Sequence, residues 1–112
     1  MKKIEAVIRP EKVGEVRKAL SEVGYPGLMI SNIEGHGTHK GKEQQWRGET
    51  MKVDFVPKVK LEIIARDADV DKITEAIIKF AKTGEIGDGK IFIYPIVDAI
   101  RIRTSEKGVE AL

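Results

Sequence analysis

The stretch TGEIGDGKIFI, residues Thr83–Ile93, separates a helical pattern from an apolar strand pattern, so it marks where one element ends and the next begins. Its glycines, Gly84, Gly87 and Gly89, allow the backbone to turn successive N–H groups toward a ligand. Lys90 adds a mobile positive charge suited to phosphate. The stretch predicts a phosphate-binding loop between a helix and a strand. A glycine-rich turn without a ligand is the alternative.

Outward from this loop, the hydrophobic pattern predicts the order strand, helix, strand, long loop, strand, helix, strand. The predicted strands cover residues 3–9, 28–35, 53–65 and 91–97, and the predicted helices cover residues 11–23 and about 70–80. This is the order of an α+β, ferredoxin-like βαββαβ sandwich with both helices on one face of the sheet. The other face has no covering layer within the chain, which predicts a homo-oligomer.

Local signals refine this order. Asp69 stands where a helix N-cap is expected, and Pro57 predicts a bulge or an edge position at the start of its strand. The run IFIYPIV has the pattern of a buried strand, and AIRIRT, residues 99–104, adds a short alternating piece. The segment from Gly35 to about Lys52 contains four glycines and no sustained period, which predicts a protruding loop.

Size and composition bound the function. A chain of 112 residues predicts one domain, residues 1–112, with a single hydrophobic core. Its net charge of +2, from 20 basic and 18 acidic residues, argues against direct nucleic-acid binding. The absence of cysteine excludes disulfides and thiolate metal sites, and it fits the cytoplasm. Because no apolar run approaches the roughly 18 residues that span a bilayer, we expect no direct membrane insertion.

The sequence offers no convincing catalytic centre. The glycine loop ends like a Walker A motif, but Ile91 replaces the Ser or Thr after the lysine and a strand follows instead of a helix. Asp88 is the only acid among these glycines and is expected to cap the turn, not to act as a base. His36 and His39 have no evident third ligand beside them, which favours the interpretation that they do not bind a metal ion. We therefore predict no enzyme.

Two pairs of basic residues are spaced for one strand face. Arg101 and Arg103 alternate on a predicted strand, so both guanidinium groups would face one side and suit a di- or triphosphate. Lys58 and Lys60 form a similar pair, with Glu62 one step further on. The alternative for both pairs is a solvated strand face, which is the usual role of such charges.

Four stretches carry a family resemblance: the opening KKIEAVIRPEKV, WRGETMKVDFVPKVKLEI from Trp46 to Ile63, Thr83–Ile93, and RIRTSEKG near the end. With these residues the chain resembles the PII nitrogen-regulatory signal-transduction proteins over essentially its whole length. The resemblance implies a cytoplasmic homotrimer of ferredoxin-like subunits that acts as a regulator. It also implies a T-loop at about residues 37–53, a B-loop at about 82–90 and a C-terminal tail at about 104–112.

The resemblance further implies that ATP or ADP binds in the cleft between neighbouring subunits, with the B-loop on the phosphates. The implied contacts from one subunit are Gly35, Gly37, Glu62, Ile64, Thr83, Gly84, Gly87, Asp88, Gly89 and Lys90, of which Glu62 and Ile64 would lie at the adenine. Arg101 and Arg103 would reach the phosphates from the adjacent subunit.

The T-loop departs from the family pattern. His39 stands where the family commonly has a glutamine that helps to bind Mg²⁺ with ATP and 2-oxoglutarate, although Lys58, the family's 2-oxoglutarate contact, is retained. Because Mg²⁺ prefers oxygen ligands, we expect 2-oxoglutarate binding to be weak or altered. Met51 has no hydroxyl for the uridylylation of many relatives, and Glu49 replaces a serine that some relatives phosphorylate.

The same loop implies a protein target, with Trp46, Arg47 and Gly48 as partner-binding residues. In relatives that control ammonium transporters, the arginine at this position enters the channel mouth, so an ammonium transporter or a nitrogen-assimilation enzyme is the expected target. Two alternatives stay open. One is a metal-responsive PII-like trimer that uses His36 and His39, with His39 acting on metal through a bound nucleotide, and the other is a weak nucleotide-hydrolysing enzyme.

Overall fold

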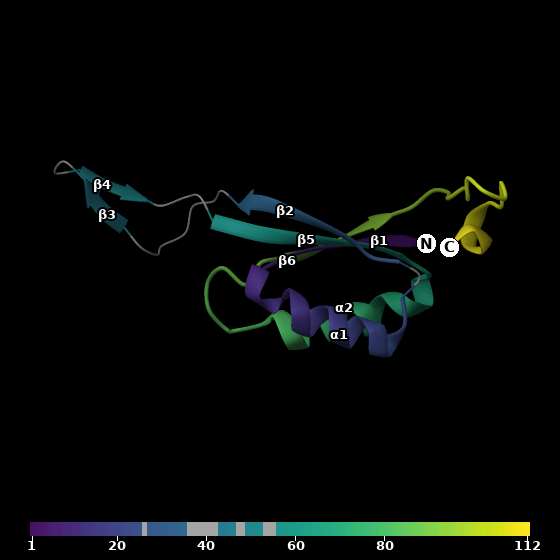
Figure 1. Ribbon diagram of the computed structural model, residues 1–112, viewed down its shortest axis with the longest axis horizontal. Helices are drawn as coiled ribbons and strands as arrows, with labels where there is room; N and C mark the ends of the chain where they lie inside the picture. The colour runs from purple at the N-terminus through teal and green to yellow at the C-terminus, as the bar shows by residue number, and fades with distance from the viewer. Residues whose placement is uncertain (26, 36–42, 47–48, 53–55) are drawn as a thin grey trace.

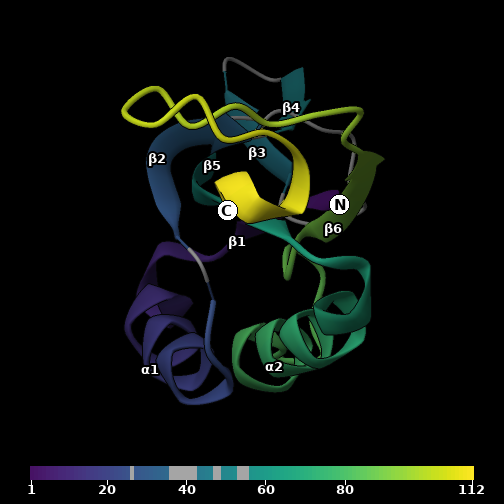
Figure 2. The same cartoon turned by 90° about the vertical axis from the view of Figure 1, so that its right-hand side faces the viewer.

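A four-stranded antiparallel sheet covered on one face by two helices forms the body of the computed structural model (Figures 1 and 2). The structure describes residues 1–25, 27–35, 43–46, 49–52 and 56–112. The sheet contains β1 (Lys2–Ile8), β2 (Met29–Gly35), β5 (Val56–Ala65) and β6 (Lys90–Pro95), and the helices are α1 (Val13–Val23) and α2 (Val70–Ala81). The strand order β2-β5-β1-β6 confirms the predicted ferredoxin-like α+β fold.

Three 3₁₀ turns complete the regular elements: η1 (Pro10–Lys12), η2 (Asp67–Asp69) and η3 (Gly108–Ala111). The first two lead directly into α1 and α2. α1 ends at Gly24, which has φ of +77°, a conformation that glycine adopts without strain. No helix in the described parts of the chain has the length and apolar character needed to cross a membrane.

The core lies between the sheet and the helices. Side chains of β1 and β5 alternate, so that every second one faces the helices. The buried residues are Ile4, Ala6, Ile8, Val59, Leu61, Ile63 and Ala65 from the sheet, with Val16, Ala19, Leu20, Ile73, Ile77 and Ala81 from the helices. Burying one such aliphatic side chain larger than alanine contributes about 1.5–3 kcal/mol. This layer fixes the end of β1, over which the glycine loop passes.

Two local predictions concern Asp69 and Pro57. Asp69 precedes α2 as predicted, but its side chain makes no capping bond; its backbone is helical (φ −97°, ψ −9°), and its carboxylate lies 3.2 Å from Lys72 Nζ. Pro57 pairs with Glu34 of β2, whereas β1 ends opposite Val59. Pro57 therefore has a neighbour on one side only, which confirms the predicted edge position.

The predicted loop contains regular structure. β3 (Glu43–Trp46) and β4 (Glu49–Lys52) form a separate antiparallel pair beyond the end of the sheet where β2 ends and β5 begins (Figure 1). The prediction was of a protruding loop and did not include this strand pair. The available sequence signal was two short runs separated by Arg47-Gly48, a glycine-containing spacing typical of tight hairpins.

β6 is more exposed in the single chain than its apolar run predicts. Phe92 and Tyr94 are 46% and 42% exposed, and Met29 of β2, on the same open face, is 55% exposed. β6 lies at the edge of the sheet, and this face carries no helices, as Figure 2 shows. The prediction of a buried strand was therefore wrong for the isolated chain.

The segment after β6 also differs from the prediction. Ile100 pairs with Lys107 in an isolated bridge, and residues 102–104 form a turn. The Arg101 N–H donates to the Glu106 carbonyl at 2.9 Å, and the Ser105 N–H donates to the Arg101 carbonyl at 2.7 Å. Arg101 and Arg103 therefore lie in a turn and do not share a strand face, because the chain reverses where the alternation predicted an extended strand.

Candidate functional site

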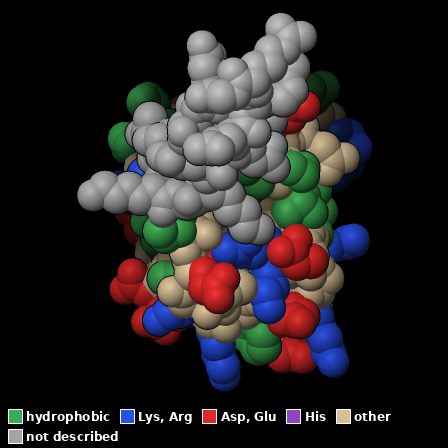
Figure 3. All heavy atoms as spheres, turned by 90° about the vertical axis from the view of Figure 1, so that its left-hand side faces the viewer, with side chains coloured by type: hydrophobic (Ala, Val, Ile, Leu, Met, Phe, Trp, Pro, Cys, Tyr) green, Lys and Arg blue, Asp and Glu red, His purple; other side chains and the backbone are tan. Residues whose placement is uncertain are grey.

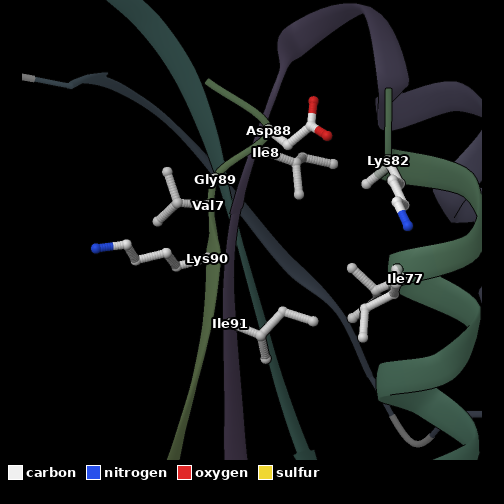
Figure 4. A pocket seen from close by; sticks show the side chains of 10 residues that line it. Val7, Ile8, Ile77, Lys82, Asp88, Gly89, Lys90 and Ile91 are labelled. Atoms are coloured by element: carbon white, nitrogen blue, oxygen red, sulfur yellow. The ribbon is translucent and has the colours of Figure 1, made fainter. Parts of the chain in front are cut away.

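The glycine loop, residues 82–89, joins the end of α2 to the start of β6 and passes over the end of β1. Gly87 and Gly89 have φ of +104° and +95°, a region that side chains disfavour. In Figure 4 the loop lies above a cavity of about 240 Å³ between β1, β6 and α2. Ile8, Ile77 and Ile91 point into this mostly apolar space, whereas Lys90 and Val7 point away from α2.

Asp88 organises the loop from within. Its carboxylate accepts the N–H groups of Thr83 (2.8 Å) and Gly84 (2.9 Å), the Thr83 hydroxyl and Arg9 Nε (3.1 Å). The Thr83 hydroxyl, with these N–H groups and Arg9, holds the pKa of the Asp88 carboxyl far below its ordinary value. A carboxylate so strongly acidic and so fully bonded cannot act as a general base near neutral pH. The predicted turn-capping role of Asp88 is therefore confirmed by its bonds.

Two cations hold the carbonyl groups of the loop. Arg9 Nη2 donates to the Ile86 carbonyl at 2.9 Å, and Lys58 Nζ donates to the Gly87 carbonyl. Burial, followed by the nearby charge of Arg9, lowers the pKa of Lys58. Among the described residues, the N–H groups of Gly87 and Asp88 have no hydrogen-bond partner. The loop thus carries bound carbonyl groups on one side and free donors beside them.

A row of basic residues crosses the open face next to the loop. The strand register places Val7 of β1 between Lys60 of β5 and Lys90 of β6. Lys58 lies two residues earlier on the same face of β5. Figure 3 shows basic and acidic side chains gathered on this end of the molecule. The free N–H donors and the lysines together suit a multiply charged anion such as a polyphosphate.

Further along the same face, Glu62 is engaged by lysines. Lys3 Nζ lies 2.9 Å from Glu62 and 3.4 Å from Glu5, and Lys60 Nζ lies 3.6 Å from Glu62. The bond to Lys3 lowers the pKa of Glu62, and the same bond raises the pKa of Lys3. This confirms that Lys58, Lys60 and Glu62 share one face, with Ile64 next along it.

The segment that follows β6, which contains Arg101 and Arg103, lies toward the other end of the sheet from the glycine loop (Figure 1). β6 runs from Lys90 to Pro95, and the following residue, Ile96, bonds to the Met1 carbonyl at 3.1 Å. Arg101 donates to the Glu106 carboxylate at 3.0 Å and to the carbonyl groups of Glu110 and Leu112 at 3.3 and 3.0 Å. One chain therefore does not bring these arginines to its own loop.

Comparison with known proteins identifies the fold family. A family model described as "Nitrogen regulatory protein P-II" matches residues 1–106. The chain belongs to the PII family. Relatives named "Nitrogen regulatory protein P-II" from Rhodospirillum rubrum and Haemophilus influenzae are each 51% identical over 112 residues, covering all of both chains. A relative of the same name from Azospirillum brasilense is 49% identical over the same span.

In this PII chain the predicted B-loop residues Thr83, Gly84, Gly87, Asp88, Gly89 and Lys90 are brought together. Gly35 also lies near this group, since a Cβ atom there would come 3.3 Å from Lys58 Cγ. Gly37, His36, His39, Arg47, Gly48 and the side chain of Trp46 lie outside the described residues. Within the described ranges, no group of three His, Cys, Asp or Glu residues is placed to hold a metal ion.

Sequence reasoning did not single out Arg9. It follows an alternating strand and precedes a proline, and neither feature separates it from an ordinary surface arginine. Only the pairing of β1 with β6 brings it to Asp88, 79 residues further along the chain.

Proposed function

We propose that this PII chain is a non-enzymatic nitrogen regulator that binds ATP or ADP between subunits of a homotrimer. Its T-loop would then engage a target protein, such as an ammonium transporter or a nitrogen-assimilation enzyme. The observation that carries the proposal is the glycine loop, in which the Gly87 and Asp88 N–H groups have no partner among the described residues and are followed closely in the chain by Lys90. Family membership supports the same function.

The geometry of a single chain supports an inter-subunit site. The glycine loop and Arg101 lie at opposite ends of the sheet, so arginines on the phosphates must come from another copy. The open sheet face and the exposed Phe92 and Tyr94 favour self-association, because monomers rarely expose adjoining large apolar side chains.

The loop is suited to binding and not to hydrolysis. Asp88 is strongly acidic, which makes it a poor base, and both of its carboxylate oxygens already accept bonds within the loop, which disfavours a further bond to Mg²⁺. Mg²⁺, where present, would be held by phosphate oxygens and by groups other than Asp88. The loop would accordingly sense a nucleotide, and the T-loop would change its order in response.

Calorimetry with ATP and with ADP tests the proposal. We expect micromolar binding that Lys90→Gln weakens by roughly tenfold, because a charge-assisted bond to phosphate is lost. Lys18→Gln, on the exposed face of α1, is the matched control and should bind as the unchanged protein does. Binding of neither nucleotide would exclude this function. Steady phosphate release that Asp88→Ala abolishes would favour the hydrolytic alternative.

A further inference from the structure

Arg9 connects the end of β1 to the glycine loop at two points. Its Nε donates to Asp88 Oδ1 at 3.1 Å, and its Nη2 donates to the Ile86 carbonyl at 2.9 Å. The guanidinium also lies across Gly87, where a Cβ atom would come 3.1 Å from Nη2. Only 22% of the Arg9 side chain is exposed. One side chain therefore spans three consecutive loop residues.

These bonds determine where the amide groups of the loop point. In a trans peptide unit, a carbonyl and the N–H of the next residue point in opposite directions. Because Arg9 binds the Ile86 carbonyl, the Gly87 N–H is turned away from Arg9. Lys58 acts on the next unit in the same way, through the Gly87 carbonyl and the Asp88 N–H. Two adjacent donors are thereby left free for an anion.

We propose that Arg9 is a positioning residue of the nucleotide site, which shapes the glycine loop through Asp88 and the Ile86 carbonyl without touching the nucleotide. This inference rests on the proposed function. A loop that is already ordered loses less conformational entropy when a ligand binds. Arg9 would therefore raise nucleotide affinity by ordering the loop before phosphate arrives.

The two bonds require the shape of arginine. Nε and Nη2 are fixed donors in one plane, so a single guanidinium reaches a carboxylate and a carbonyl at once. A lysine at this position has one ammonium group on a flexible stem and would keep one bond at most with good geometry. Arg9→Lys should therefore give an effect between those of the unchanged protein and Arg9→Gln.

The test combines binding with a measurement on the nucleotide-free protein. We expect ATP and ADP to bind about 5- to 50-fold more weakly to Arg9→Gln, and about 2- to 10-fold more weakly to Arg9→Lys. Hydrogen exchange of the Thr83 and Gly84 amides, which donate to Asp88, should become faster in Arg9→Gln before any nucleotide is added. Arg17→Gln, on the exposed face of α1, should change neither quantity.

Each outcome separates the two proposals. If the unchanged protein binds no nucleotide, the proposed function fails, while the exchange of Thr83 and Gly84 still tests whether Arg9 orders the loop. If Arg9→Gln binds nucleotide like the unchanged protein, the positioning role is overturned. Weaker binding with unchanged exchange would also overturn it, because Arg9 would then act on the ligand directly. A double variant with Asp88→Asn should lose little more affinity than either single variant, since both act through one network.

Discussion

Gly89 lies so close to the backbone of Val7 that a Cβ atom on Gly89 would come 1.7 Å from the Val7 carbonyl oxygen. The loop crosses the end of β1 at a separation that only glycine allows, and φ of +95° at Gly89 adds to the requirement. This contact fixes the height of the loop above the sheet, and so the position of Lys90, the next residue.

Gly89→Ala should therefore lower the free energy of unfolding by at least about 2 kcal/mol and abolish nucleotide binding, because backbone atoms would have to move apart. Urea unfolding and calorimetry measure the two effects. Gly14→Ala is the control: it lies in α1 with nothing within 4 Å of a built Cβ atom, and should gain about 0.5–1 kcal/mol. A Gly89→Ala variant as stable as the unchanged protein would contradict the contact.

Asp88 should make the loop sensitive to acid. Because folding lowers the pKa of this carboxyl, its contribution to stability is present above the unfolded pKa of about 3.9 and is lost as the pH falls toward the folded pKa. Asp88→Asn should be less stable at pH 7, and its melting temperature should approach that of the unchanged protein below about pH 3. Glu62 and Asp67 also have lowered pKa values, but the unchanged protein and Asp88→Asn both retain these residues. The difference in melting temperature between the two proteins therefore reports on Asp88 alone. A difference in melting temperature that stays constant from pH 7 to pH 2 would refute this assignment.

Glu106 should compete with a nucleotide for Arg101. The Arg101 guanidinium already binds the Glu106 carboxylate, and a partly exposed pair of this kind contributes about 0.2–1 kcal/mol. If Arg101 reaches the phosphates of a neighbouring site, Glu106→Gln should tighten ATP binding up to about fivefold. Glu110→Gln is a matched control, since Glu110 offers Arg101 its carbonyl and not its carboxylate. Unchanged or weaker ATP binding by Glu106→Gln would argue against competition.

The open face of the sheet should hold the subunits together. Phe92→Glu places a charge on this face and should shift the proposed trimer toward monomer in light scattering coupled to size-exclusion chromatography. Ile78→Glu is a suitable control, because Ile78 is 53% exposed but belongs to α2 in the helical layer. Equal molar masses for Phe92→Glu and the unchanged protein would exclude the open face as the interface.

His39 should limit the response to 2-oxoglutarate. Since an imidazole replaces the amide oxygen found in the family, His39→Gln should strengthen ATP- and Mg²⁺-dependent 2-oxoglutarate binding, by about tenfold for one ligand oxygen regained. Titration calorimetry of both proteins with ATP and Mg²⁺ present provides the comparison. Tight 2-oxoglutarate binding by the unchanged protein would count against the prediction.

The fold could be predicted from the sequence because its signals are local. The alternation of Ile4, Ala6 and Ile8 reports one strand, and the helical spacing of Ile73 and Ile77 reports one helix, with no knowledge of what they pack against. The glycine loop could be located for the same reason, since the backbone at Gly87 and Gly89 has positive φ angles that glycine adopts without strain.

The predictions that were wrong depended on pairings that the sequence pattern does not mark. The exposure of Phe92 depends on which strand lies at the sheet edge. The turn after Arg101 depends on the bond from the Arg101 N–H to Glu106 and on the bridge between Ile100 and Lys107. Arg9 was missed because its role depends on its bond to Asp88, and only the pairing of β1 with β6 brings these two residues together. Contacts of this kind leave no periodic pattern of residues in the sequence.

The central position of β1 has a consequence for the newly made chain. The strand Lys2–Ile8 is synthesised before both of its partners, β5 and β6, the second of which ends at Pro95. Until β5 and β6 have both left the ribosome, Ile4 and Ile8 lack one or both neighbouring strands, and apolar side chains in this state attract chaperones or other nascent chains. Such distant pairing also slows folding compared with a helical bundle of similar size. The complete sheet would thus form only after β6 has emerged from the ribosome.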